Sequence, residues 1–388
     1  MKILIVSEMS PPYSIGGGEV RYEMLSRELA CRGHEVTWVS MHQQASPSEE
    51  WRDGVRHLHL GPRIAAPPLR PLYAMLWFML AVFAFVLRER FDVVDCQTYA
   101  PLPAAWLACK MTRTPMVATI HDVSTRGGAA DDQWLSRRDR ILAVLAEKLL
   151  YRLPYRRIIT VSENVGSVLR DVMGVKPERI RVVPNAVEAG PIQSVVPESS
   201  SCDLIFVGRL VPHKHPEDFL TVLDLLNRRA TASGRRPFGA KIVGGGPLEI
   251  GLREEIARRG LSTAVDLVGP LVGHFEVIAY VKAAQLLILP STREGFGLVL
   301  VEAMACGALL AAYDIPAVRE TVGPGLAPNL VPPRDTHALA HVVWNLLHDQ
   351  DLARAQRMYG KQRVTSQYAP TRFAGDVEAV YQEILRRC

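Results

Sequence analysis

The chain has 388 residues, of which 48% are hydrophobic and 22% are charged. This length exceeds one ordinary domain and suits two, and the apolar content excludes a disordered chain. The net charge of +5 is mildly basic, but no basic block is interleaved with aromatic residues, so we expect no nucleic-acid partner. A phosphorylated substrate or an anionic membrane surface explains the charge equally well.

The amino-terminal segment and the cysteines indicate in which cellular compartment the protein is found. The first nine residues hold a short apolar run that ends in Glu8, which is too short for a signal peptide and predicts a strand over residues 2–7. The six cysteines form no C-x-x-C pair and show no spacing typical of zinc sites or disulfide frameworks. We therefore expect a cytoplasmic protein, and association with the inner face of the membrane stays open.

A glycine-rich loop follows the first strand. Gly16 and Gly17, with a third glycine behind them, precede a predicted helix over residues 20–31. Glycines let the backbone approach a ligand closely, and the start of a helix favours an anion. The loop does not match the G-x-G-x-x-G fingerprint, so a dinucleotide site is weakly supported and a flexible turn is the alternative.

Residues 71–87 form an uncharged run of seventeen. Spanning a bilayer takes about 20 residues, and a predicted strand follows almost at once. We therefore predict a buried or partly buried crossover helix between two strands. The run contains Trp77 and three phenylalanines, which is more aromatic than a core helix requires, so contact with a membrane surface is the alternative.

Strand-like and helical runs alternate along the whole chain, which predicts an α/β fold with parallel sheets and right-handed crossovers. One predicted strand, residues 116–120, ends at His121. Open α/β sheets place ligand contacts at the carboxyl ends of their strands, although a lone histidine is more often structural.

A polar, proline-bearing segment at residues 189–201 is predicted to link two domains.

The second half begins with a strand over residues 203–207, and its loop delivers two cations, Arg209 and Lys214. Arginine can grip a diphosphate with two parallel hydrogen bonds, and lysine can neutralise it as a point charge. Two solvated surface charges are the default alternative.

Another motif is the stretch 286–307. A buried strand ends at residue 289, a loop carries Glu294 and two glycines, and a helix begins at Leu298 with Glu302 in its second turn. Amides at the helix start can hold a phosphate, and the two carboxylates can accept hydrogen bonds from sugar hydroxyls. This arrangement suits a sugar nucleotide, and an ordinary strand-loop-helix with solvated glutamates is the alternative.

Three motifs together resemble one family. The E-x7-E stretch, the G-R-L-x-x-x-K loop and the amino-terminal P-P-x-x-x-G-G-x-E and R-G-H-E-V segments resemble the retaining glycosyltransferases of family 4, also called group 1. The resemblance implies a GT-B fold, in which two Rossmann-like domains face each other across a cleft. It also implies an acceptor-binding domain over residues 1–190 plus 371–388 and a nucleotide-sugar-binding domain over residues 201–370.

The resemblance also assigns roles to single residues. The sequence departs from the family pattern at His215, where the family usually has a glycine. The expected catalytic groups are His121 and Glu294, which position the donor sugar. The donor diphosphate is expected to bind to Arg209, Lys214, Phe296, Gly297 and Leu298. The ribose and base of the nucleotide are expected to contact Glu302 and Leu271. The acceptor or a phosphate is expected to contact Gly16 and Gly17. No metal and no cofactor are expected, because the protein supplies the positive charges itself.

The function implied is that of a retaining hexosyltransferase. It would move a hexose from a UDP- or GDP-sugar to an acceptor hydroxyl in polysaccharide or glycolipid synthesis. The acceptor can be a sugar, a lipid-linked molecule or a small molecule, with peripheral membrane contact through residues 71–87. The alternative is a catalytically inactive module that binds nucleotide sugars at the membrane surface.

Overall fold

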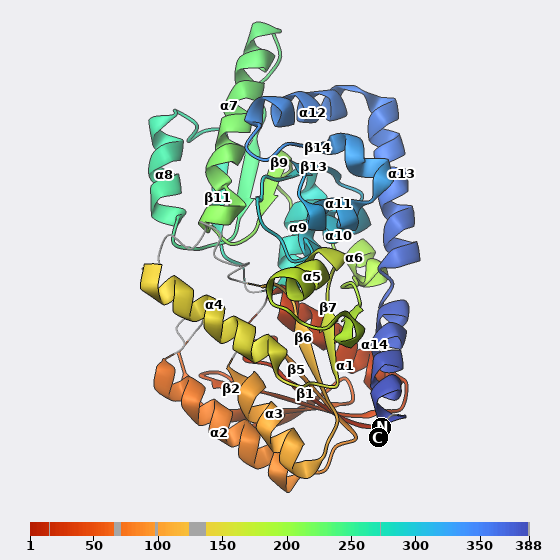
Figure 1. The fold of residues 1–388 in the computed structure, drawn as a ribbon. Helices are drawn as coiled ribbons and strands as arrows, with labels where there is room; N and C mark the ends of the chain where they lie inside the picture. Colours follow the sequence, from red (N-terminus) through yellow and green to blue (C-terminus); the bar gives the residue numbers. More distant parts are fainter. Residues whose placement is uncertain (15, 66–70, 98–99, 124–136, 272, 387–388) are drawn as a thin grey trace. The chain divides into compact units, whose positions relative to one another are not determined.

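The computed structural model describes the whole chain except residues 15, 66–70, 98–99, 124–136, 272 and 387–388, and it leaves out the side chains of residues 137–140 and 142–143. The chain divides into two compact units. Unit 1 comprises Met1–Asn185 and Pro370–Cys388, and unit 2 comprises Ala186–Ala369. Each unit has its own sheet covered by helices, which confirms the predicted α/β class (Figure 1).

The sheet of unit 1 has eight strands in the order β3-β4-β2-β1-β5-β6-β7-β8. All neighbours are parallel except β3, which pairs antiparallel with β4. The central strands read as continuous apolar runs because both of their faces are buried. The bounds are β1 Lys2–Val6, β2 Glu35–Gln43, β3 Glu49–Arg52, β4 Val55–Ile64, β5 Val93–Gln97, β6 Met116–Ile120, β7 Arg157–Thr160 and β8 Ile180–Val182.

The helices of unit 1 connect these strands, and the last one comes from the carboxyl terminus and packs on the first. They are α1 Gly17–Cys31, α2 Leu72–Arg88, α3 Pro101–Thr112, α4 Arg137–Arg152, the short α5 Glu163–Ser167 and α14 Pro370–Leu385. Ser162 caps α5 by accepting a hydrogen bond from the Val165 amide at 3.2 Å. Helix α1 begins earlier than predicted, so Gly17 belongs to its first turn and not to a loop.

Strand β3 was not predicted from the sequence. Its four residues, Glu49–Arg52, alternate between exposed and half-buried because the strand lies at the edge of the sheet. An ion pair between Glu49 and Arg56 of β4 joins the two strands at 2.8 Å. Edge strands tolerate charged side chains, so polarity alone does not exclude a strand.

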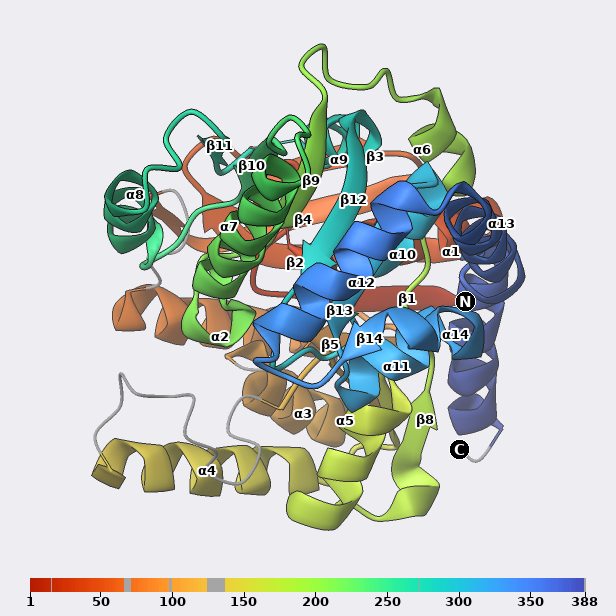
Figure 2. The ribbon, with the colours of Figure 1, turned by 90° about the horizontal axis from the view of Figure 1, so that it is seen from above.

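The sheet of unit 2 has six parallel strands in the order β11-β10-β9-β12-β13-β14. Helices α7 and α12 lie side by side on one of its faces and contribute to a large apolar cluster there (Figure 2). The strands are β9 Cys202–Val207, β10 Ala240–Val243, β11 Val265–Gly269, β12 Ala284–Leu289, β13 Leu309–Tyr313 and β14 Leu330–Val331. The helices are α6 Ala189–Ser194, α7 Pro216–Ala232, α8 Glu249–Arg258, α9 His274–Ala283, α10 Leu298–Cys306, α11 Pro316–Val322, α12 Thr336–His348 and α13 Gln350–Gln367.

The predicted linker at residues 189–201 is wrong in part. Its first six residues form helix α6, which belongs to unit 2. The side chain of Lys282 donates to the carbonyls of Ile192, Gln193 and Val195 at 2.6–3.2 Å. A cation that satisfies the last carbonyls of a helix stabilises its carboxyl end, and this distant partner cannot be read from the local sequence.

The predicted helix over residues 71–87 is α2, Leu72–Arg88. Its inner face, which includes Phe78, is buried against the unit 1 sheet, and much of its outer face is exposed. The helix is therefore partly buried, as predicted. Within the described parts of the chain, no helix combines the length and the apolar character needed to cross a bilayer.

Both sheets follow the strand order of a Rossmann fold, in which the direction of the winding reverses once. The reversal falls between β1 and β5 in unit 1 and between β9 and β12 in unit 2. Loops at the carboxyl ends of the two strands diverge at such a point and leave a crevice where ligands bind. This rule directs attention to one group of loops in each unit.

Glycines after β10 allow two of the unit 2 loops to pack backbone against backbone. Gly244 has φ +137, and a Cβ atom there would lie 2.0 Å from the carbonyl oxygen of Gly208, just past β9. The Leu210 amide also donates to the Gly245 carbonyl at 2.9 Å. The loop that carries Arg209 and Lys214 can therefore follow this path only because Gly244 has no side chain.

We expect Gly244→Ala to destabilise the protein by about 1–3 kcal/mol, because the added methyl group must displace a neighbouring backbone. It should also shift the β9 loop, which the Gly208 carbonyl begins. Gly239→Ala is the matched control, because nothing lies within 4 Å of its added Cβ. Calorimetry of both variants checks the prediction, and equal melting temperatures would show that the loop contact is unimportant.

Candidate functional site

Two loops meet at the reversal point of unit 2. One follows β9 and spans residues 208–215, and the other follows β12 and spans residues 290–297. The Thr292 amide donates to the His213 carbonyl at 2.9 Å, and Thr292 Oγ1 lies 3.0 Å from Nε2 of His215. Two predicted motifs, about 80 residues apart in the chain, are thus hydrogen-bonded to each other.

Two of the predicted site residues contact each other directly across these loops. Lys214 Nζ donates to Glu294 Oε1 at 2.5 Å, and the two side chains are only 14% and 10% exposed. A charge-assisted hydrogen bond in such a partly buried place fixes both groups. The residue expected to neutralise the diphosphate and the residue expected to hold the sugar are therefore within reach of one ligand.

The β9 loop carries the two cationic side chains Arg209 and Lys214. Arg209 is exposed at its start, and among the described residues its side chain has no ion-pair partner. The pKa of His213 is lowered to about 3, first by burial and then by the neighbouring cations Arg293, Lys214 and Arg209. A histidine that stays neutral beside several cations indicates a loop suited to an anion.

His215 occupies the position where the resembled family usually has glycine. Its backbone is left-handed, with φ 46 and ψ 55, which glycine adopts without cost. Its Nδ1 lies 2.8 Å from Glu217 Oε1, while its Nε2 contacts Thr292. The substitution thus keeps the glycine-like backbone and compensates with side-chain contacts.

Helix α10 begins directly after the β12 loop. Gly297 is its N-cap, with φ +88, a conformation that favours glycine. Phe296 is buried, its ring packs edge-on against Tyr368 at 5.5 Å, and its carbonyl accepts a hydrogen bond from Thr321 at 2.5 Å. The first amides of the helix, beginning at Leu298, have no acceptor inside it and carry the positive end of its dipole.

Glu302 lies in the second turn of α10 and is buried, which raises the pKa of its carboxyl group. His274, the first residue of α9, approaches it with Nε2 at 3.6 Å from Oε1. The half-buried Leu271 precedes His274 by three residues in the loop after β11. His274 was missed by the sequence analysis, although its place behind a strand end could have indicated it.

In unit 1, four groups gather at the reversal point between β1 and β5. A Cβ atom on Gly18 would lie 2.3 Å from Gln97 Nε2 and 3.4 Å from His121 Nε2. Gln97 ends β5, His121 follows β6, and Tyr22 of α1 presents its ring to His121 at 6.1 Å. Gln97 was missed, and the rule that picked His121 applies to it equally.

The predicted glycines Gly16 and Gly17 lie two residues and one residue before Gly18. Gly16 is the N-cap of α1 with an extended backbone, and Gly17 is exposed in the first turn. A Cβ atom on Gly18 would collide with the end of the Gln97 side chain, and a Cβ atom on Gly16 would lie 2.6 Å from Glu19 Oε2. The backbone of this loop is therefore closely approached by side chains at Gly16 and at Gly18.

His121 has the environment of a ligand-contacting group. Its Nε2 is buried and has no hydrogen-bond partner among the described residues. Burial, and then the nearby Arg21 cation, lower the pKa of His121 to about 3. Buried polar atoms almost always have a partner, so a bound molecule is a natural one for this nitrogen.

We expect the imidazole of His121 to stay neutral down to about pH 5, because its folded pKa lies below the unfolded value of 6.5. The unfolded chain takes up a proton on lowering the pH through this range and the folded chain does not, so stability contributed by this group is lost as the pH falls. An NMR titration of the ring checks this. A midpoint near the unfolded value would contradict it, and His121→Gln should make the unfolding free energy less dependent on pH in the same range.

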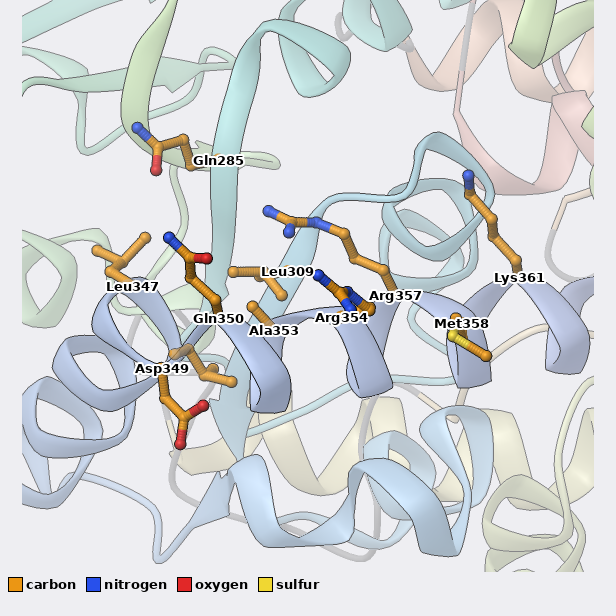
Figure 3. Close-up of a pocket in the computed structure, with 11 residues that line it drawn as sticks. Gln285, Leu309, Leu347, Asp349, Gln350, Ala353, Arg354, Arg357, Met358 and Lys361 are labelled. Carbon is orange, nitrogen blue, oxygen red and sulfur yellow. The ribbon is translucent and has the colours of Figure 1, made fainter.

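A cavity of about 480 Å³ also lies in unit 2 (Figure 3). It is lined by Gln285 and Leu309, near the amino ends of β12 and β13, and by residues of α12 and α13. The loops described above lie at the opposite, carboxyl edge of the sheet. This cavity is therefore separate from the predicted donor site.

In the described parts of the chain, no group of three His, Cys, Asp or Glu side chains could hold a metal ion.

Comparison with known proteins places the chain in a family. Residues 15–190 match the family model for Glycosyltransferase Family 4, and residues 193–363 match the model for Glycosyl transferases group 1. A glycogen synthase of Mycobacterium tuberculosis is 29% identical over 387 residues, which covers 95% of this chain and 91% of that protein.

Two solved structures share the fold. A sucrose-phosphate synthase from Thermosynechococcus elongatus superposes with a TM-score of 0.83 at 21% identity and covers all of both chains. Anabaena Alr3699/HepE in complex with UDP and glucose superposes with a TM-score of 0.75 at 17% identity, over 99% of this chain and 100% of that one. The chain thus has a GT-B fold with two Rossmann-like domains, and it belongs to the family 4, group 1 glycosyltransferases.

Proposed function

We propose that this glycosyltransferase moves a hexose from a nucleotide diphosphate sugar to an acceptor hydroxyl and retains the configuration at the anomeric carbon. The observation that carries the proposal is the Lys214–Glu294 pair at the reversal point of unit 2. The pair supports the proposal because a cation suited to a diphosphate lies beside a carboxylate suited to sugar hydroxyls, four residues before the start of α10.

A UDP-linked hexose is the first donor to test, and a GDP-linked one is the second. The HepE structure is described as a complex with UDP and glucose, and the similar glycogen synthase is named for a glucose polymer. In our proposal Arg209 and Lys214 bind the diphosphate with the amides near Phe296, Gly297 and Leu298. Glu302 then binds the ribose, and the backbone near Leu271 contacts the base.

The proposed chemistry needs no nucleophile from the protein. The bond between the anomeric carbon and the diphosphate oxygen breaks, and the acceptor oxygen bonds to the same face of that carbon. The acceptor proton passes to the departing phosphate oxygen, so protons and charges balance. Fixed positive groups stabilise the charge that develops on the leaving diphosphate, while Glu294 and His121 position the sugar.

The proposal includes catalysis without a metal, because cationic side chains and helix amides supply the positive charge. We expect the rate of transfer to be unchanged after dialysis against EDTA, as measured by release of the nucleoside diphosphate. Complete loss of activity that Mg²⁺ restores would show that the β9 loop does not carry the diphosphate charge alone.

Several classes of acceptor molecule are compatible with this proposal. We propose polysaccharide or glycolipid synthesis, with a lipid-linked acceptor favoured by the exposed apolar side chains of α2 within residues 71–87. The second candidate function is an inactive module that binds nucleotide sugars at the membrane surface. Buried and connected site residues such as Lys214 and Glu294 favour the enzyme over the module.

The test is incubation of the purified chain with UDP-glucose and, separately, with a GDP-hexose. Release of the free nucleotide, together with an α-linked product from an α-linked donor seen by NMR, supports retaining transfer. Binding of the donor without any release in the presence of cell-extract acceptors would favour the module. An inverted product would overturn the assignment of retention.

A further inference from the structure

Helix α2 exposes an unusual amount of apolar surface. Leu72, Tyr73, Trp77 and Leu80 are each 57–71% exposed, and Leu76 is 51% exposed. A helix that is apolar on all sides is normally buried, and large exposed apolar patches mark surfaces that contact a partner.

The packing of unit 1 fixes which side of α2 is free. Ala74, Phe78, Val82 and Val86 recur every four residues and are fully buried. A Cβ atom on Gly61 of β4 would lie 3.6 Å from the backbone of Phe78, so the helix lies directly on that strand. The exposed residues occupy the opposite side of the helix, and they cannot turn inward without removing α2 from the sheet.

Helix α3 extends the same surface. It packs along α2 and lies on β5 and β6 (Figure 1). Leu107 and Met111 are exposed on it, and Lys110 lies over the ring of Trp106 at 5.3 Å. Tryptophan and lysine are residues that anchor proteins at the boundary between lipid and water. We call the exposed side chains of α2 and α3 together the α2–α3 surface.

The exposed charges of α2 and α3 are all positive. Neither α2 nor α3 contains an acidic residue, and Arg88, Arg90, Lys110 and Arg113 are exposed at or just beyond their carboxyl ends. Both helices are crossovers between parallel strands, so these ends lie at the same edge of the sheet.

The nearby acids are already engaged. Glu89 pairs with Arg56 at 3.2 Å, and Asp92 accepts a hydrogen bond from the Lys2 amide at 2.7 Å. None of the four exposed cations named above has an ion pair within the described residues. The basic edge is therefore available to an anionic partner.

We propose that the α2–α3 surface docks on an anionic phospholipid leaflet. The apolar side chains enter the interface while the cations contact lipid phosphates, and α2 lies in the plane of the membrane. The exposed cations complement anionic lipid headgroups, which favours a lipid surface over an apolar protein partner. This inference rests on the proposed function only in that it would bring the enzyme to a lipid-linked acceptor.

The helix lies on the membrane in this proposal and does not cross it. Seventeen residues span about 25 Å as a helix, which is shorter than the hydrocarbon core of about 30 Å, and the inner face of α2 is committed to the sheet.

The test is sedimentation of the full chain with vesicles of phosphatidylcholine alone or mixed with phosphatidylglycerol. We expect binding to the mixed vesicles that weakens with added salt, and at least about tenfold weaker partition for the double variant Trp77→Ser, Leu80→Ser. Ile250→Ser is the matched control, because Ile250 of α8 is 76% exposed and lies in unit 2. Arg88→Glu should weaken binding, and Arg235→Glu, which changes an exposed arginine of unit 2, should weaken it far less.

Equal sedimentation of the wild type and the double variant, or no sedimentation of the wild type at low salt, would overturn the proposal. A dimer in vesicle-free buffer that the double variant dissociates would assign the surface to a second copy instead. Release of UDP from UDP-glucose without vesicles should be the same for the double variant and the wild type. If the wild type releases no UDP but sediments, the proposed function fails and the docking surface stands.

Discussion

Replacing Lys214 by alanine should lower the rate of sugar transfer about 100-fold, which corresponds to about 2.7 kcal/mol in the activation barrier. The charge on the leaving diphosphate develops in the transition state, so a missing cation raises the barrier more than it weakens ground-state binding. The partner carboxylate of Glu294 also loses its 2.5 Å contact. Steady-state kinetics with UDP-glucose should show the loss mainly in kcat.

The controls for this prediction use the same pair. Lys214→Arg keeps the charge and should recover part of the rate, whereas Glu294→Ala should cost at least about tenfold. Because the two side chains touch, the double variant should lose less than the product of the two single losses. Wild-type rates for both alanine variants, with unchanged melting temperatures, would remove the pair from the site.

Asp95→Ala should destabilise unit 1 by about 3 kcal/mol or more, because it leaves several buried hydroxyl groups without an acceptor. The Asp95 carboxylate is buried and accepts hydrogen bonds from Tyr22 at 2.8 Å, Thr119 at 2.7 Å and Tyr381 at 2.6 Å. Tyr381 belongs to α14, so this one carboxylate ties the last helix of the chain to the sheet of unit 1.

Calorimetry measures this effect as a fall in the melting temperature. Tyr381→Phe removes one of the three donors and should cost about 1 kcal/mol. Asp376→Ala on the same helix is the matched control, since its side chain is 52% exposed and its ion pair with Arg372 is long, at 3.9 Å. That control should change stability by less than about 0.5 kcal/mol. Equal melting temperatures for Asp95→Ala and the control would show that α14 is held by other contacts.

Local patterns predicted much of the fold. The run at residues 71–87 became α2 almost to the residue, because a long uncharged stretch between two strands has few alternatives. The strand before Glu294 and the helix after Gly297 were also correct, since a loop between a buried strand and an apolar helix is marked by glycine. These elements depend on residues close together in the chain.

The errors have a common physical cause, which is dependence on distant partners. Strand β3 is polar and forms because β4 offers it an edge, and α6 forms where Lys282 binds its carbonyls. Neither partner is visible in the local sequence. The start of α1 also differed from the prediction, because its first turn includes Gly17.

The sequence indicated candidate site residues, but it did not indicate the contacts between them. The sequence indicated Lys214 and Glu294 as separate groups with separate tasks, and the structure joins them by a hydrogen bond. The sequence likewise indicated Gly16 and Gly17, and the structure adds Gly18, where a Cβ atom would meet Gln97. His274 and Gln97 were missed because no motif marks them, and only the strand order brings them to the ends where ligands bind.

The central claim is that a diphosphate binds between the β9 loop and the amino end of α10. A crystal structure of the chain with UDP tests it most directly. We predict that the phosphate oxygens lie within about 3 Å of Lys214 Nζ, of the Arg209 guanidinium and of the first amides of α10. A diphosphate bound elsewhere, with both cations far from every phosphorus atom, would contradict the account.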